Sequence, residues 1–258
     1  MVQTSADDVL EGVAKNIFPR MLYKYRDFGD LTRTLEIIKT AQLYFSTPSH
    51  FNDPLDCNLS WDNQFGWTDI KALMVKHSFE DPQIESALKQ IAKDSPELIR
   101  NMRDESINTA VHSKGLLSLA KHYDKILMWS HYCKNHSGIV FGFDITEDPE
   151  FFSIPMNVEY TKEYTPLLFS GDLIKALISN FSLKHLDWSY EEEVRIYKET
   201  FGLYNFKKSS LKEIFFGCKT EQSNIDLVKK ECLAHGYNVI FKKAKIAFGR
   251  FELEFEDC

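Results

Sequence analysis

The chain has 258 residues, a formal net charge of −7 and 14% aromatic residues. This length can bury a large α/β core without disulfide bonds, and the negative charge argues against indiscriminate binding to nucleic acids. The five cysteines show no CxxC or CxxH spacing, which argues against a structural zinc site and a disulfide scaffold and favours a reduced cytoplasmic compartment.

Helical and strand patterns alternate in the N-terminal part of the chain. Apolar residues at helical spacing predict a helix over residues 7–17, which ends before Pro19, and another over residues 31–39. Alternating side chains predict strands over residues 21–26 and 42–46. The start lacks a basic segment followed by an apolar run, and no later window approaches the roughly 18 apolar residues of a membrane helix. We therefore expect a soluble protein with no membrane partner.

A long polar stretch follows. Residues 69–112 have a helical pattern broken by two prolines, which predicts an insertion of two or three helices with solvated outer faces. We expect this insertion to lie within a single α+β domain over residues 1–258. The later predicted elements are strands over residues 115–120, 138–144, 157–160, 211–216, 238–242 and 248–255, and helices over residues 171–181 and 222–235.

An acidic stretch over residues 188–195 concentrates charge late in the chain. If it is a strand, Glu191, Glu193 and Arg195 share one face. Such a row is costly to bury unpaired and ordinary on a surface, so a solvated strand face or an ion-pair ladder is the structural alternative to a functional site.

Familiar catalytic motifs do not occur. The chain has no GxxxxGK[ST], GxGxxG, GxSxG or HExxH motif, which removes the usual support for nucleotide triphosphatase, Rossmann, α/β-hydrolase and zincin functions. His131 and His136 have poor spacing for shared metal ligation, so no metal site is expected. Ser130 and His131 are neighbours that point to different sides of a strand, which argues against a shared proton between them.

Four segments combine aromatic residues with small polar or charged ones. In chain order, they read LYKYR, LYFSTPSHFNDPLD, LMWSHY followed by HSGIVFGFD, and WSYEEEVR. With these motifs the chain resembles a widespread bacterial family catalogued as domain of unknown function 2971. The resemblance spans roughly residues 21–255 and is loosest in the helical insertion.

The layout also resembles that of ADP-ribosyltransferases. A strand ending in Arg26, a helix over residues 31–39, the hydroxyl residues Ser46 and Thr47, and the late acidic residues 191–193 follow the order found in those enzymes. The sequence departs from the family in lacking a full Ser-Thr-Ser motif. This resemblance implies an α+β fold with mixed, mainly antiparallel sheets around a cleft, together with the helical insertion.

The same resemblance implies a site for NAD, which is consumed as a substrate. Glu193 is expected to hold the ribose 2′-hydroxyl and stabilise the oxocarbenium-like state, while Glu191 orients the nucleophile or acts as its base. Arg26 is expected to grip the pyrophosphate. The other expected cofactor-binding residues are Tyr25, Ser46, Thr47, Asn52, Asp53, Trp129, His131 and Tyr132.

Each assignment has a structural alternative. Arg26 can pair with Asp27 or Asp53, and the aromatic residues Trp129 and Tyr132 can belong to the core. Residues 46–48 can simply end a strand, and residues 52–54 can form a turn.

The leading functional hypothesis is an NAD-dependent ADP-ribosyltransferase-like enzyme. Its acceptor would be a macromolecule, RNA, DNA or protein, and by analogy it would serve as a toxin or a phage-defence effector, with an antitoxin or inhibitor protein as a possible partner. One alternative is a nuclease in which Glu191, Glu193 and Asp53 hold a divalent metal. Another is a non-catalytic module that senses or binds a nucleotide or a partner protein. The basic clusters that could meet nucleic acid are Lys207 with Lys208 and Lys242 with Lys243 and Lys245, and a solvated surface explains them equally well.

Overall fold

The computed structural model describes residues 6–61, 65–76, 78–79, 81–166 and 173–258. The chain divides into two compact units, here named the sheet unit and the insertion unit. The sheet unit consists of Met1–Ser46, Gly115–Val158 and Asp187–Cys258, and the insertion unit consists of Thr47–Lys114 and Glu159–Leu186. The single domain over residues 1–258 stays a prediction.

The sheet unit is built on a mixed sheet whose strand order is β12-β11-β10-β4-β1-β3-β8-β5. All neighbouring strands are antiparallel except β10 and β11, which are parallel, so the predicted α+β class with a mainly antiparallel sheet is confirmed. Strands β2 and β9 form a separate antiparallel pair. The bounds are β1 Met21–Arg26, β2 Gln42–Phe45, β3 Gly115–Ala120, β4 Ile139–Asp144, β5 Pro155–Asn157, β8 Glu193–Lys198, β9 Gly202–Asn205, β10 Leu211–Phe216, β11 Ile240–Ile246 and β12 Leu253–Asp257.

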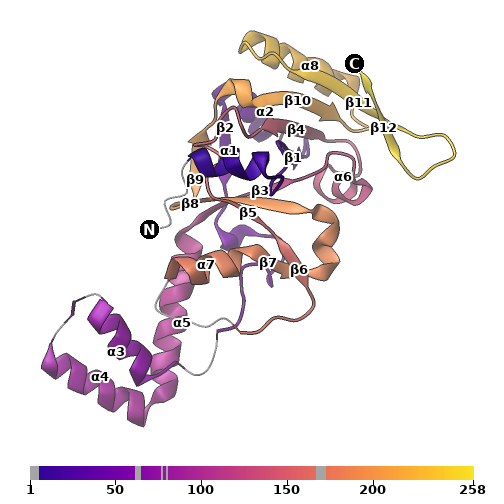
Figure 1. Cartoon of the computed structure of the whole chain (residues 1–258). Coiled ribbons are helices and arrows are strands. Elements are labelled where there is room, and N and C mark those ends of the chain that lie inside the picture. The colour runs from indigo at the N-terminus through magenta and orange to yellow at the C-terminus, as the bar shows by residue number, and fades with distance from the viewer. Residues whose placement is uncertain (1–5, 62–64, 77, 80, 167–172) are drawn as a thin grey trace. The chain divides into compact units, whose positions relative to one another are not determined.

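Helices cover both faces of the large sheet. Side chains alternate between the two faces of the sheet along β1, so Leu22 packs in one apolar cluster and Tyr23 and Tyr25 pack in another. The first cluster includes buried residues of α1 (Ala6–Ala14), α2 (Leu31–Thr40) and α8 (Gln222–Ala234), and the second includes those of α6 (Ile126–Tyr132). Figure 1 shows α8 and the β11–β12 hairpin, in yellow, at one edge of this sheet.

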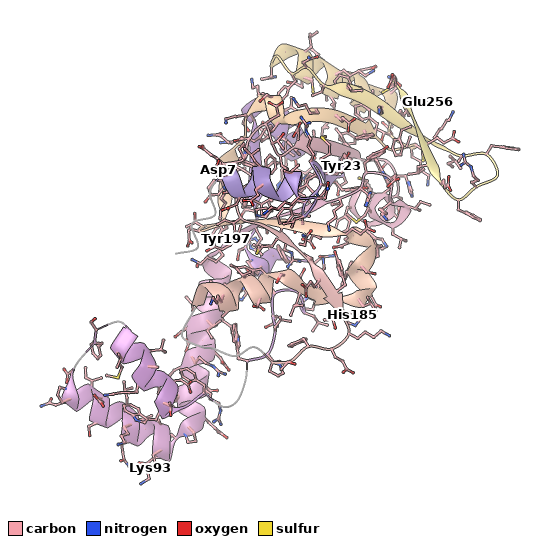
Figure 2. All side chains as sticks on the ribbon, viewed as in Figure 1. Asp7, Tyr23, Lys93, His185, Tyr197 and Glu256 are labelled. Atoms are coloured by element: carbon pink, nitrogen blue, oxygen red, sulfur yellow. The ribbon has the colours of Figure 1, made fainter. Side chains whose placement is uncertain are left out.

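The insertion unit is mainly helical. Its elements are η1 Pro48–His50, α3 Trp67–Lys76, α4 Pro82–Asp94, α5 Pro96–Ser113 and α7 Leu173–Ser182, with the parallel strands β6 Glu159–Thr161 and β7 Leu183–His185. The two prolines expected to break the insertion each begin a helix, because proline at the first helical position needs no hydrogen-bond partner for a backbone N–H. Helix α4 has no buried residue, and its Lys93 is exposed (Figure 2). Residues 171 and 172 of the helix predicted over 171–181 lie outside the described residues.

Several predicted boundaries are wrong. Helix α1 ends at Ala14 and not at residue 17, and the strand predicted over residues 157–160 is divided between β5 and β6. Strand β9 was not anticipated, and β12 begins later than the strand predicted over residues 248–255. Among the described residues, no helix has the length and apolar character needed to cross a membrane.

Candidate functional site

The acidic stretch does not run as one strand. Residues Leu186–Glu191 form a 3₁₀ helix, Glu192 adopts a left-handed conformation with φ 42°, and β8 begins only at Glu193. The Glu192 carboxylate contacts His122 Nε2 at 2.6 Å and Lys125 Nζ at 3.0 Å, which anchors this turn. The predicted row of three charges on one strand face is therefore wrong for Glu191, because the turn at Glu192 separates it from the strand.

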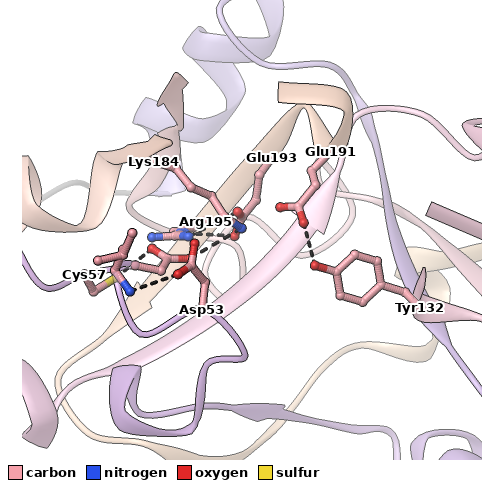
Figure 3. Close-up of polar contacts among 9 residues, drawn as sticks. Asp53, Cys57, Tyr132, Lys184, Glu191, Glu193 and Arg195 are labelled. Atoms are coloured by element: carbon pink, nitrogen blue, oxygen red, sulfur yellow. Dashed lines mark hydrogen bonds and ion pairs between the residues drawn. The ribbon is translucent and has the colours of Figure 1, made fainter. Parts of the chain in front are cut away.

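Glu193 and Arg195 do share one face of β8. Arg195 donates from Nε to Glu193 Oε1 at 2.8 Å and from Nη2 to Oε2 at 3.1 Å (Figure 3). Arg195 is fully buried and Glu193 is 4% exposed. A paired guanidinium and carboxylate offset the cost of burying both charges, and the two bonds fix how the carboxylate is oriented.

Glu191 is held by a different donor. Tyr132, the last residue of α6, donates its hydroxyl to Glu191 Oε1 at 2.5 Å (Figure 3), and Glu191 is 4% exposed. The adjacent His131 Nδ1 lies 2.8 Å from the hydroxyl oxygen of Tyr190. Two successive side chains of α6 thus contact two successive residues before β8, so the end of this helix positions Glu191.

Strand β1 brings positive charge to the same unit. Lys24 donates a hydrogen bond from Nζ to the Ser118 carbonyl of β3 at 2.9 Å. The antiparallel register of β1 and β3 pairs the neighbouring Tyr23 with Ala120. Burial and the positive charge of Arg26 together lower the pKa of Lys24 to about 8, with Glu193 opposing part of the shift.

The guanidinium of Arg26 makes no ion pair within the described part of the chain, so the predicted pairing with Asp27 is not observed. Burial lowers the pKa of Arg26, as does the nearby charge of Arg33, while Asp27 and Asp30 oppose the shift. Both carboxylates accept backbone N–H groups, of Gly29 and Arg33 respectively, in the connection that follows β1. Arg26 is only partly exposed, which makes it a candidate for binding an anion.

The lowered pKa of Lys24 predicts that the stability of the protein depends on pH. Its folded pKa of about 8 lies below its ordinary value of 10.5, so the unfolded chain holds this proton more tightly between those two pH values. The free energy of unfolding should therefore rise with pH through this window, relative to a Lys24→Met variant that lacks the titration. Urea unfolding of both proteins at pH 7, 8, 9 and 10 measures this difference, and a constant difference would contradict the prediction.

Two aromatic residues of the expected NAD site lie in the core. Trp129 is fully buried and donates its indole N–H to the Tyr123 carbonyl at 2.7 Å, and Tyr25 is 6% exposed and donates its hydroxyl to the His122 carbonyl at 2.9 Å. Their rings meet edge to face at 5.6 Å. Neighbouring side chains cover both rings, which agrees with the core alternative for Trp129, and the stacking of either ring on a ligand stays a prediction.

The hydroxyl and turn residues serve local structure. Ser46 pairs through its backbone with Leu116, with both hydrogen bonds at 2.8 Å. Within the insertion unit, the Thr47 hydroxyl donates to the His112 carbonyl at 2.7 Å, and Asp53 Oδ1 accepts the Leu55 N–H at 2.9 Å in a turn. Asn52 is exposed in the same segment. These contacts agree with the structural alternatives for residues 46–48 and 52–54.

The sheet unit therefore brings Tyr132 to Glu191, and it places Lys24, which was not predicted, within electrostatic reach of Glu191, Glu193 and Arg26. Alternation along β1 places Lys24 on the same face as Arg26, so the strand pattern contained a signal for it. Thr47, Asn52 and Asp53 belong to the insertion unit. Within the described ranges, no group of three or more His, Cys, Asp or Glu side chains is arranged to hold a metal ion.

Comparison with known proteins adds a family match. No curated protein and no solved structure matches the chain significantly. Residues 128–196, which include most of α6 together with Glu191, Glu193 and Arg195, match the profile of the family described as "Protein of unknown function (DUF2971)". This match supports the family resemblance of the sequence motifs.

Proposed function

We propose that the protein is an NAD-dependent ADP-ribosyltransferase-like enzyme that modifies a macromolecule. The observation that supports this function is the pair of buried carboxylates before and at the start of β8, each positioned by its own donor. Tyr132 holds Glu191, and Arg195 holds Glu193. Breaking the bond between nicotinamide and ribose develops positive charge on the sugar, and fixed carboxylates stabilise that charge without reorganising.

The proposed roles follow from this positioning. Glu193 accepts the ribose 2′-hydroxyl with a carboxylate whose orientation is fixed by Arg195. Glu191 orients the incoming nucleophile or takes its proton. Arg26, with Lys24 near it, binds the pyrophosphate.

The proposal names only the class of acceptor that receives the ADP-ribose. RNA, DNA or protein would receive the ADP-ribose, and the protein would act as a toxin or a phage-defence effector, restrained by an antitoxin or inhibitor protein. A divalent-metal nuclease and a non-catalytic nucleotide-binding module are the competing functions, and the experiment below separates all three.

The test incubates the protein with labelled NAD and cell extract and measures both label transfer and nicotinamide release. We expect Glu193→Gln and Arg26→Ala each to lower the initial rate about 100-fold or more, because each removes a group that acts on the transition state or positions the substrate. Glu192→Gln is the matched control. It changes the neighbouring carboxylate, which contacts His122 and Lys125, and should retain the rate within about twofold.

Thermal unfolding of each variant separates lost activity from lost folding. Wild-type protein that releases no nicotinamide would contradict the proposal. Magnesium-dependent degradation of RNA or DNA without NAD would support the nuclease. Binding of NAD without turnover would support the non-catalytic module.

A further inference from the structure

A serine and a histidine meet on a different side of α6 from the Glu191 contact. Ser130 Oγ lies 3.1 Å from His136 Nε2, and both residues are partly exposed. Residues two apart on a helix point about 200° apart, so Ser130 and Tyr132 face different directions. The sequence places His131 next to Ser130 and argues against a shared proton between those two, whereas the fold brings His136 to Ser130 because residues 126–132 form a helix followed by a tight turn.

The backbone at His136 adopts a strained left-handed conformation that two backbone hydrogen bonds keep in place. Lys134, Asn135 and His136 have φ values of 44°, 56° and 69°, a left-handed conformation that each such residue adopts at a cost of roughly 1 kcal/mol or more. The His136 N–H donates to the Trp129 carbonyl at 3.0 Å, and the His136 carbonyl accepts the Lys219 N–H at 2.9 Å. Contacts on both sides therefore keep the imidazole at Ser130.

Gly217 permits this arrangement. A Cβ at residue 217 would lie 2.1 Å from the carbonyl oxygen of His136, so any other residue would push the turn away. The loop after β10 and the turn after α6 thus fit together only with glycine at this position. Strain kept in place by a close backbone approach is a feature of functional sites.

The environment of the ring favours the neutral form. Burial lowers the pKa of His136, and the positive charge of Lys219 lowers it further. Nδ1 is buried and has no hydrogen-bond partner within the described residues. For Nε2 to accept the Ser130 hydroxyl proton, the neutral ring must carry its own N–H on Nδ1, and the lowered pKa of His136 favours this neutral ring.

We propose that Ser130 and His136 are the nucleophile and base of a second reactive centre, which takes an acyl group from an activated ester. Ser130 Oγ attacks the carbonyl carbon and forms the new C–O bond while His136 Nε2 takes the hydroxyl proton. The bond to the leaving alcohol then breaks, and its oxygen receives that proton from His136. Water repeats the sequence on the acyl-serine and releases the carboxylic acid.

The probe is p-nitrophenyl acetate, with no NAD present, so that the outcome is independent of the proposed ADP-ribosyl transfer. Release of nitrophenol is followed by absorbance, and the acetylated peptide is located by mass spectrometry. We expect acetate on Ser130 and an approximately 100-fold lower rate for Ser130→Ala and for His136→Gln. Ser137→Ala is the matched control, because Ser137 bonds the Lys134 carbonyl and not a histidine, and it should keep the wild-type rate.

The pH profile gives a second readout, which a purely structural role for His136 would not produce. The wild-type rate should reach its plateau with a midpoint below 6.5, the ordinary value for histidine, and Ser130→Ala should lack this step. If His136→Gln does not fold, Ser130→Ala and the location of the acetyl group decide the outcome. An unchanged rate in Ser130→Ala, or acetate on residues other than Ser130, would overturn the proposal.

Discussion

Replacing Arg195 by methionine is expected to lower the free energy of unfolding by about 3–5 kcal/mol. Arg195 is fully buried and donates two hydrogen bonds to Glu193, which is also buried. Methionine preserves much of the side-chain volume and removes the positive charge, so the Glu193 carboxylate would be left in the interior without this partner. Urea unfolding monitored by circular dichroism measures the loss.

A double variant tests the cause of that loss. Glu193→Gln combined with Arg195→Met leaves no charge at either position, so it should recover a substantial part of the stability lost by Arg195→Met alone. The control is Glu192→Gln, whose ion pairs are partly exposed and should be worth no more than about 1 kcal/mol. If Arg195→Met costs less than the control, the buried pair does not stabilise the sheet unit.

Trp129→Ala should lower the free energy of unfolding by a similar amount, about 3–5 kcal/mol. The indole is fully buried, donates to the Tyr123 carbonyl and packs edge to face against Tyr25. Removing it leaves a cavity beneath the sheet and an unsatisfied carbonyl. Thermal and urea unfolding of the purified variant provide the measurement.

This prediction distinguishes a core tryptophan from a ligand-stacking one. A tryptophan that stacks on a ligand would lose binding with little change in stability, whereas a core residue loses stability first. Phe251→Ala is the matched control, because its ring is fully exposed in the β11–β12 connection and should cost about 0.5 kcal/mol or less. Equal stability of Trp129→Ala and wild type would contradict the core assignment.

Elements with strong local patterns were predictable. The alternation in residues 21–26, the apolar run over residues 115–120 and the helical spacing over residues 31–39 correspond to β1, β3 and α2 within a residue. These patterns depend on the period of the backbone, which is a local property. Strand β9 was not anticipated because it begins with glycine and ends with asparagine, two residues that are depleted in strands and common in turns.

The candidate site was predictable only in part. The two carboxylates and Arg26 stood out because charged residues beside aromatic ones are unusual in a core, yet the left-handed turn at Glu192 has no local sequence signal, since glutamate rarely adopts it. The partners Tyr132 and Glu191 are 59 positions apart, and only the folded sheet unit brings them together.

Local periodicity was therefore enough to identify the strands around β1 and the acidic stretch as a place of interest, and the resemblance to a known family implied the α+β class with mainly antiparallel sheets. Which of its carboxylates pairs with Arg195, whether Trp129 faces a ligand or the core, and which histidine meets Ser130 depended on the assembled sheet unit. The physical reason is that burial and hydrogen-bond partners arise between segments far apart in the chain, whereas backbone periodicity is set by neighbouring residues.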